Sequence, residues 1–421
     1  MQPGLTRHTR RAFLREAAAG LVATTALPSL VHGLPSSRPA GPVQEPFWEL
    51  VKAQFPLRPD LTMLNAANLC PAPRAVSDRV TELTRDIDAD PSFQNRAKFS
   101  GLESRSREAL GRYLGAEADE FVITRNTSEG NNAIVNALDF EAGDEVVIWE
   151  QNHPTNNVAW DVRAERTGLA VRRVTTPAAP RSPDELAAPF LAALTPRTRV
   201  LAFSHVSNTT GVRLPAARLC AEARTRGIRT LIDGAQTVGA LQLDLHTLDC
   251  DFYTSSAHKW FMGPKEAGIL YIRAELAPSL WPPIVGVGWE GARARAARRL
   301  GTLGQRDDAT VAAMATTVEF HEGIGVPRIE ARVLELAAFL KRRIRETMPD
   351  AMILTPDDPA MSAGVVVFTV PGLDLRPAYD RLYQEHGVAC ATQSGGFRFC
   401  PHVYTTIRDL EQTVARVASL R

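Results

Sequence analysis

Two residues near the middle of the chain, an aspartate and a lysine 26 positions apart, combine acid and amine chemistry. Asp233 ends the apolar run of LIDGAQTVGA, and Lys259 follows the next short apolar run, in SSAHKWFMGP. Ligands of open α/β sheets bind beside the carboxyl ends of the strands, so both side chains can face one crevice. A carboxylate stabilises the proton on a pyridine nitrogen, and a lysine with a lowered pKa condenses with an aldehyde. Because pyridoxal phosphate contains both groups, we expect Lys259 to bind it as a Schiff base, with Asp233 at the ring nitrogen and Gln236 at the phenolate oxygen.

The phosphate of such a cofactor requires hydrogen-bond donors, and two short segments provide them. Thr127 and Ser128 follow the apolar run FVIT and begin a segment of helical periodicity, where hydroxyls and backbone N–H groups form an anion site. Ser256 and His258 come just before the lysine and add a hydroxyl and an imidazole. We therefore predict that these four residues bind the phosphate.

Two further polar residues follow predicted strands in the same way. His153 comes after the run EVVIW, and Asn208 comes after RVLAF. An imidazole at a strand end can stack on an aromatic cofactor, so we expect His153 at the ring face. Strand ends from four different parts of the chain thus supply groups suited to one cofactor.

Bringing these residues together requires a sheet of parallel strands. From about residue 102, short runs that are almost entirely apolar alternate with helical patterns, which is typical of a parallel sheet covered by helices. We expect strands at 121–124, 145–149, 199–203, 229–232, 251–255 and 268–272. After about residue 310, the pattern predicts a long helix (331–348), an apolar strand (364–370) and a C-terminal helix. The sequence therefore predicts an α/β fold, with a mainly parallel sheet in a large domain (60–305) and a smaller α+β domain (46–59 and 306–421).

Composition narrows the class of partner. Lys plus Arg number 48 and Asp plus Glu 47, so a formal net charge of +1 provides no field to attract nucleic acid or an anionic membrane. Hydrophobic residues are 44% and charged residues 23%, as in ordinary globular proteins. The five cysteines form no CxxC pair, and the histidines His205, His246, His321, His386 and His402 lack metal-ligand spacing, so we predict no metal site. The expected partner is a small molecule.

The N-terminus predicts export. Residues 9–15 read TRRAFLR, and the 14 residues from 17 to 30 are apolar and rich in alanine, a pattern that resembles a twin-arginine signal. So short a run does not span a bilayer as a helix, which argues against a stable membrane anchor. We expect a signal peptide (1–33), a Pro- and Ser-rich linker (34–45), transport of the folded protein by the twin-arginine translocase, and a periplasmic or secreted location. The alternative is a basic amphipathic helix of a cytoplasmic protein.

The order of the candidate residues from about residue 55 onward resembles the class V aminotransferase family. The family comprises pyridoxal-phosphate enzymes of fold type I, among them isopenicillin N epimerase-like proteins and cysteine desulfurases. The resemblance rests on His258-Lys259 for the family's His-Lys pair, Asp233 and Gln236 for its Asp-x-x-Gln, and Thr127 and Ser128 for its phosphate loop. By the same resemblance, His153 stacks on the ring, Asn208 lies beside the phenolate, and Arg398, in GFRFCPHVYTT, binds the substrate carboxylate, for which a guanidinium is well shaped.

Two departures from the family pattern bear on the reaction. Cysteine desulfurases carry a nucleophilic cysteine on a loop some fifteen residues before the carboxylate-binding arginine, whereas Cys390 lies 8 before Arg398. We expect this thiol to pack as a small hydrophobic group within a strand. The family often donates a Gly-Thr from a partner subunit to the phosphate, but the matching stretch reads Gly304-Gln305-Arg306. Gln305 can donate from its amide, and the resemblance implies a homodimer with shared active sites.

The resemblance implies action on the amino group of an amino acid or peptide. Transamination is the first expectation and epimerisation or lyase chemistry the second, with cysteine desulfuration less favoured. A different class, the Rossmann dinucleotide enzymes, is suggested by the GxGxxG match at 286–291. That motif lies late in the chain, after Pro282-Pro283, and no strand ending in an acidic residue follows at the required distance. The Rossmann alternative is therefore disfavoured.

Overall fold

The computed structural model describes residues 44–287, 289, 295 and 299–421. The predicted signal peptide (1–33) and nearly all of the predicted linker (34–45) lie outside the described residues. Much of the GxGxxG stretch, 288 and 290–291, lies outside them as well.

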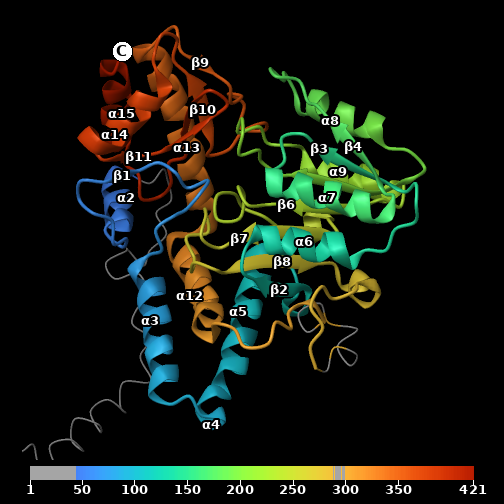
Figure 1. Ribbon diagram of the computed structural model, residues 1–421. Helices are drawn as coiled ribbons and strands as arrows, with labels where there is room; N and C mark the ends of the chain where they lie inside the picture. Colours follow the sequence, from blue (N-terminus) through green and yellow to red (C-terminus); the bar gives the residue numbers. More distant parts are fainter. Residues whose placement is uncertain (1–43, 288, 290–294, 296–298) are drawn as a thin grey trace, which may run out of the picture.

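A seven-stranded sheet forms the centre of the molecule (Figure 1). Its order is β2-β8-β7-β6-β5-β3-β4, and β8 runs antiparallel to both neighbours while the strands from β7 to β4 are parallel. The strands are β2 (Phe121–Thr124), β3 (Glu145–Trp149), β4 (Ala170–Val174), β5 (Thr198–Ser204), β6 (Arg229–Asp233), β7 (Phe252–Ser256) and β8 (Gly268–Ile272). All six predicted strands are confirmed to within one residue. The sequence did not predict β4, which lies at the sheet edge. Its exposed arginines give it a polar sequence rather than an apolar run.

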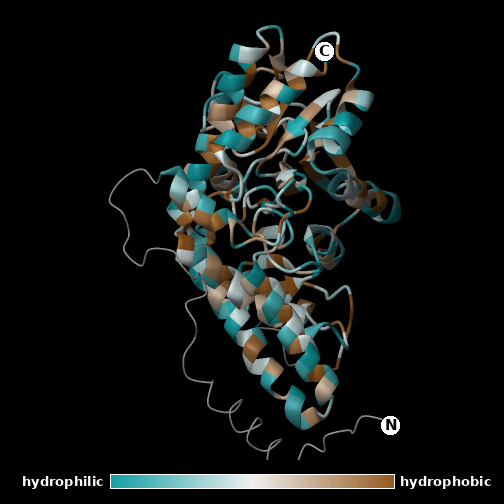
Figure 2. Ribbon diagram, turned by 90° about the vertical axis from the view of Figure 1, so that its left-hand side faces the viewer, coloured by the Kyte–Doolittle hydropathy of each residue, from teal (hydrophilic) through white to brown (hydrophobic). Residues whose placement is uncertain are grey.

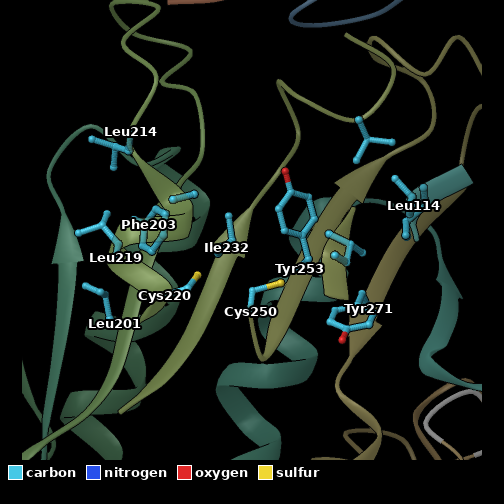
Figure 3. Packing of buried hydrophobic residues seen from close by; sticks show 14 of the residues in the cluster. Leu114, Leu201, Phe203, Leu214, Leu219, Cys220, Ile232, Cys250, Tyr253 and Tyr271 are labelled. Atoms are coloured by element: carbon cyan, nitrogen blue, oxygen red, sulfur yellow. The ribbon is translucent and has the colours of Figure 1, made fainter. Parts of the chain in front are cut away.

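Helices cover both faces of this sheet. Residues along each strand alternate between the two faces, so Phe121 and Ile123 join one apolar cluster while Val122 joins the other. In Figure 3, Phe203, Ile232 and Tyr253 lie in the first of these clusters, together with Leu219. The helices around the sheet are α3 (Arg74–Ala89), α4 (Phe93–Arg96), α5 (Lys98–Leu114), α6 (Thr127–Ala137), α7 (Pro154–Thr167), α8 (Pro183–Ala193), α9 (Ala216–Thr225), α10 (Leu245–Leu248) and α12 (Asp308–Ile324), with short 3-10 turns at Ala118–Glu120 and Ala274–Ser279.

The C-terminal part forms a second layer of smaller sheets and helices, at the top of Figure 1. An antiparallel sheet of order β12-β13-β10-β9 packs with α13, α14 and α15 in one apolar cluster. The elements are α13 (Val326–Thr347), β9 (Met352–Ile353), β10 (Val366–Thr369), α14 (Leu375–His386), β11 (Val388–Ala389), β12 (Ala391–Gln393), β13 (Gly396–Phe399) and α15 (Ile407–Ser419). The predicted long helix, the predicted apolar strand and the C-terminal helix are all present, so the predicted α/β fold with a smaller α+β part is confirmed.

Two segments connect these parts. The short strand β1 (Thr62–Met63) pairs in parallel with β11, and α2 (Glu45–Lys52) is tied to α15 by the Lys52–Asp409 ion pair. The helix α12 instead packs on α3 and α5, forming the helical arm at the bottom of Figure 1, whose surface in Figure 2 mixes hydrophilic and hydrophobic residues. The domain boundaries that we predicted (60–305 against 46–59 with 306–421) stay a prediction.

Among the described helices, none is long and apolar enough to cross a membrane. All five cysteines, Cys70, Cys220, Cys250, Cys390 and Cys400, lie buried as free thiols.

Candidate functional site

Asp233 lies at the carboxyl end of β6, between β5 and β7, and is buried. Its Oδ1 accepts a hydrogen bond from the backbone N–H of Ala235 (3.0 Å), and its Oδ2 accepts one from Nδ2 of Asn131 (3.3 Å). Gly234 follows directly, and a Cβ at this position would overlap the ring of Tyr253 beneath it. The carboxylate is therefore held in one orientation by a strand end, a helix side chain and a close-packed glycine turn.

Lys259 lies in the turn after β7 and is half-buried. Burial lowers the pKa of its amine, Asp233 opposes that shift, and the positive charge of Arg398 adds to it. A lower pKa increases the fraction of neutral amine, which is the nucleophilic form. The lysine therefore senses the charges of both the aspartate and the arginine.

A hydroxyl cluster lies at the start of α6. The backbone N–H of Thr127 donates to Oγ of Ser256 (2.8 Å), and the two hydroxyls are 2.6 Å apart. The side chain of Asn126 caps the helix by accepting from the N–H of Glu129 (3.0 Å), and Ser128 lies half-buried in the first turn. Helix N-termini bind anions because their N–H groups and dipole face outward, so this cluster fits a phosphate.

Two histidines lie beside the lysine. His153 begins α7, where its Nδ1 accepts from the N–H of Thr155 (3.3 Å). Its side chain is solvent-accessible, but loss of water around the imidazole and then the charge of Lys259 lower its pKa. His258 is half-buried, and burial followed by the charges of Lys259 and Lys265 lowers its pKa to about 4. Both rings are therefore neutral near pH 7.

The amide of Gln236 is fixed at both ends. Its Nε2 donates to the carbonyl of Ala67 (3.1 Å), and its Oε1 accepts from the indole Nε1 of Trp260 (2.7 Å). One amide hydrogen stays available, since the NH₂ group carries two. The side chain of Asn208 is half-buried on the loop after β5.

Arg398, on β13, is the predicted site residue that comes from the small sheet. Its Nη1 donates to the backbone carbonyl of Asn208 (3.3 Å), and its Nη2 donates to Oδ1 of Asn65 (3.2 Å). The side chain is buried, and its Nε has no hydrogen-bond partner among the described residues. A buried guanidinium that lacks a carboxylate partner suits the carboxylate of a small molecule.

Gln305 lies apart from the hydroxyl cluster within one chain. Its side chain is exposed, and its Oε1 accepts from Nη2 of Arg96 (2.7 Å) on the helical arm. The contribution of Gln305 to the phosphate of a partner subunit, which the resemblance implied, stays a prediction.

Sequence reasoning missed two residues that contact the predicted ones. Asn131 is four positions after Thr127 on α6, so helical periodicity alone puts it on the face toward Asp233. Asn65 lies at an isolated bridge to Cys400, and its contact with Arg398 joins residues 333 positions apart. Nothing local in the sequence signals that pairing.

Cys390, the cysteine that precedes Arg398 by eight positions, is buried. Cys390 lies between β11 and β12 in the core of the small sheet, and desolvation raises the pKa of its thiol to about 12. The expectation that Cys390 packs as a small hydrophobic group is confirmed, but it lies between two short strands rather than within one. The described residues contain no group of three or more His, Cys, Asp or Glu that could hold a metal ion.

Together these groups fit pyridoxal phosphate. The set combines an amine of lowered pKa, a fixed carboxylate, a hydroxyl cluster at a helix N-terminus and neutral imidazoles, from strands β3, β5, β6 and β7 and helix α6. A ring nitrogen, an aldehyde and a phosphate require these groups.

Comparisons with known proteins agree with this donor set. A family model described as aminotransferase class V matches residues 63–420. The isopenicillin N epimerase of Streptomyces clavuligerus is 33% identical over 383 residues, covering 87% of this chain and 96% of that protein. A cysteine desulfurase of Salmonella dublin is 31% identical over 374 residues, covering 82% and 87%. The structure of a C-DES variant with glycine covalently linked to its pyridoxal-phosphate cofactor superposes with a TM-score of 0.81 at 25% identity, covering 88% and 99%.

Proposed function

The chain belongs to the class V aminotransferase family, whose cofactor is pyridoxal phosphate, and on that premise we propose that it acts at the Cα of an amino acid or peptide that has a free amino group and a carboxylate. The observation that carries the proposal is geometric: Asp233 ends β6, Lys259 follows the neighbouring strand β7, and Arg398 donates to the carbonyl of Asn208 on the loop after β5. These three side chains supply an amine, a carboxylate and a carboxylate-binding cation in one site.

We assign each residue a task that its contacts support. Bound pyridoxal phosphate supplies an electron-withdrawing ring that stabilises negative charge at Cα of an attached amino acid. Lys259 holds the cofactor and then moves the Cα proton at its Nζ, which its lowered pKa favours. Asp233 supplies the negative charge for the ring nitrogen, and Arg398 orients the substrate carboxylate.

The remaining predicted groups bind the cofactor. Thr127, Ser128, Ser256 and His258 form the phosphate site, which is supported by the hydroxyl contacts at the start of α6. His153 stacks on the ring, and Gln236 and Asn208 lie at the phenolate side. Of these, Gln236 is the most rigidly held, since Ala67 and Trp260 fix its amide.

Among reactions at Cα, we place epimerisation first and transamination, the first expectation from the sequence, second. The reason is that the relative named isopenicillin N epimerase matches 96% of its own length at 33% identity, whereas transamination is favoured by the family-level description. The purified enzyme in deuterium oxide distinguishes them. Epimerisation gives deuterium at Cα of the amino acid with no keto acid, and transamination gives stoichiometric keto acid. If neither product forms from any member of a panel of amino acids and peptides with a free amino group, both reactions are contradicted.

Persulfide chemistry at Cys390 is disfavoured, and its removal provides a direct test. Cys390→Ala is expected to leave turnover within about twofold, because a thiol with a pKa of about 12 in an apolar core provides almost no thiolate. The measurement is kcat with a substrate found in the panel of amino acids and peptides, alongside sulfide release from cysteine. Sulfide release that disappears in Cys390→Ala would make cysteine desulfuration the activity.

We propose further that the protein is exported through the twin-arginine translocase and works in the periplasm or outside the cell, which rests on the TRRAFLR motif and the apolar run after it. Cell fractionation of wild type and an Arg10→Lys, Arg11→Lys variant tests this location. Export predicts that the variant accumulates in the cytoplasm, and an unchanged distribution would remove the proposal.

A homodimer is the proposed assembly. Trp281, Ile284, Val285 and Val287 expose apolar surface close to the predicted Gln305 segment, and Ile284 lines a depression of about 270 Å³ together with Arg125 and Gln305. Analytical ultracentrifugation measures the assembly directly. A mass of one chain across the working concentration range would contradict a shared site.

A further inference from the structure

Lys259 lies in a turn of residues 257–263, here called the lysine turn. Five consecutive backbone carbonyls of this turn each accept a hydrogen bond. Buried backbone carbonyls require such partners, and three of these five donors come from outside the turn. The donors are Gly263 N for the carbonyl of Ala257 (2.7 Å), Cys70 N for that of His258 (2.7 Å), Met262 N for that of Lys259 (2.8 Å), His402 Nε2 for that of Trp260 (2.7 Å) and His321 Nε2 for that of Phe261 (2.8 Å).

Two of these donors are imidazole rings from distant elements. His402 lies on the loop between β13 and α15, and His321 lies on α12. Both rings are fully buried. A third donor, Cys70, comes from the N-terminal segment. The lysine turn is therefore held from three separate parts of the chain.

The contacts of each ring fix which nitrogen carries the hydrogen. A carbonyl can only accept, so Nε2 must be the protonated nitrogen in both histidines. Nδ1 of His402 accepts from the N–H of Val403 (2.8 Å), and Nδ1 of His321 faces the hydroxyl of Tyr113 (3.1 Å). Burial lowers the pKa of His321 to about 4 and that of His402 to about 3, so both rings stay neutral donors at ordinary pH.

The lysine turn depends on such contacts from outside. Met262 has a φ of 53°, a left-handed conformation that a residue other than glycine adopts only when its surroundings enforce it. The indole of Trp260 is held as well, since its Nε1 donates to Gln236 and its ring lies 5.2 Å from that of His402. The carbonyls of Trp260 and Phe261 follow Lys259 directly, so these bonds determine where the lysine Cα lies.

His402 is also four positions from Arg398 along one segment. In that segment, the guanidinium of Arg398 donates to Asn65 and Asn208, and the imidazole of His402 donates to the lysine turn. The distance between the carboxylate-binding group and the lysine amine is therefore set by a short piece of chain with fixed ends. Proton transfer at Cα is sensitive to that distance.

We propose that His402 and His321 are positioning residues that hold the lysine turn, and through it the amine of Lys259, in place relative to Asp233 and Arg398. The proposal rests on the proposed function of Lys259. The competing explanation is that both are core histidines that contribute stability alone.

Substitutions at His402 separate the two explanations. In His402→Asn, the side-chain oxygen takes the place of Nδ1 and still accepts from Val403, but the side chain is too short to reach Trp260. In His402→Gln, the amide nitrogen reaches the place of Nε2 and can donate to the Trp260 carbonyl. The pair therefore removes and restores the contact with the lysine turn.

The expected result is a loss of turnover rather than of substrate binding. His402→Asn should lower kcat about tenfold and change KM less than about threefold, and His402→Gln should recover most of the loss. A second readout does not use turnover: the rate at which apoprotein takes up pyridoxal phosphate, followed by visible absorbance. Uptake requires the amine to be in place, so it should slow in His402→Asn and recover in His402→Gln.

Leu336→Ala is the control for stability, because Leu336 is buried in the cluster of the small sheet. If His402→Asn lowers the melting temperature as Leu336→Ala does while kcat, KM and cofactor uptake stay at wild-type values, the proposal is overturned. Should His402→Asn fail to fold, His321→Asn and His321→Gln decide by the same readouts. Failure of the proposed function is distinct, since wild type would then turn over none of the amino acids or peptides while its rate of cofactor uptake still compares with those of the variants.

Discussion

Replacing Lys259 by alanine is expected to lower kcat by roughly 10⁴-fold or more and to abolish the visible absorbance of bound pyridoxal phosphate. Under the proposed assignment, the variant loses together the amine that attaches the cofactor and the base that moves the Cα proton. The measurement combines steady-state kinetics with an absorbance spectrum of the protein after dialysis against pyridoxal phosphate.

Lys265→Ala is the matched control. Lys265 lies six residues later, is exposed, and donates to the carbonyl of Cys70 (3.2 Å). Its removal should leave kcat within about twofold and the spectrum unchanged. A Lys259→Ala protein with wild-type spectrum and turnover would refute the assignment of the cofactor lysine.

Asp233→Asn is expected to reduce kcat by roughly 10³-fold while the cofactor still binds. Asparagine keeps the size of the side chain and can accept from the N–H of Ala235, but it removes the negative charge that favours a proton on the ring nitrogen. The cofactor should therefore remain attached to Lys259 while its capacity to stabilise charge at Cα falls. Kinetics and the visible spectrum of the loaded protein measure the two effects separately.

Asp251→Asn serves as the comparison for Asp233→Asn. Asp251 lies directly before the first residue of β7, at the end of the strand away from Lys259. It is also buried, and it accepts a hydrogen bond from the N–H of Thr230 (2.8 Å). Its loss should reduce the melting temperature without altering the spectrum. If both variants lose stability equally and neither changes kcat beyond about twofold, Asp233 has no role at the ring nitrogen.

Most of the sheet could be predicted because its strands are buried on both faces. FVIT, EVVIW and GILYI are apolar at nearly every position, and such runs mark strands that are buried on both faces of the sheet, whether they pair in parallel or not. The edge strand β4, with Arg172 and Arg173 facing water, carries no such pattern. Strand ends then locate Asp233, His153 and Asn208 without any knowledge of tertiary contacts.

What the sequence could not predict depends on contacts between distant segments. Asn65 meets Arg398 through a single bridge between chain segments, and no periodicity joins them. The spacing of His321 and His402 in the sequence predicts no metal ligand and indicates no other role, and both rings are buried. Their contact with the lysine turn depends on where α12 and the loop after β13 end up, which local pattern does not determine.

The burial of every cysteine has a consequence for how the protein tolerates its surroundings. Oxidants and disulfide exchange act on the thiolate, and burial raises the pKa of Cys70, Cys220 and Cys390 to about 12 and that of Cys250 and Cys400 above its usual value. Reagents from solvent also cannot reach sulfur atoms enclosed in the core. The folded protein therefore tolerates both a reducing and an oxidising medium without forming or requiring a cross-link between the described cysteines.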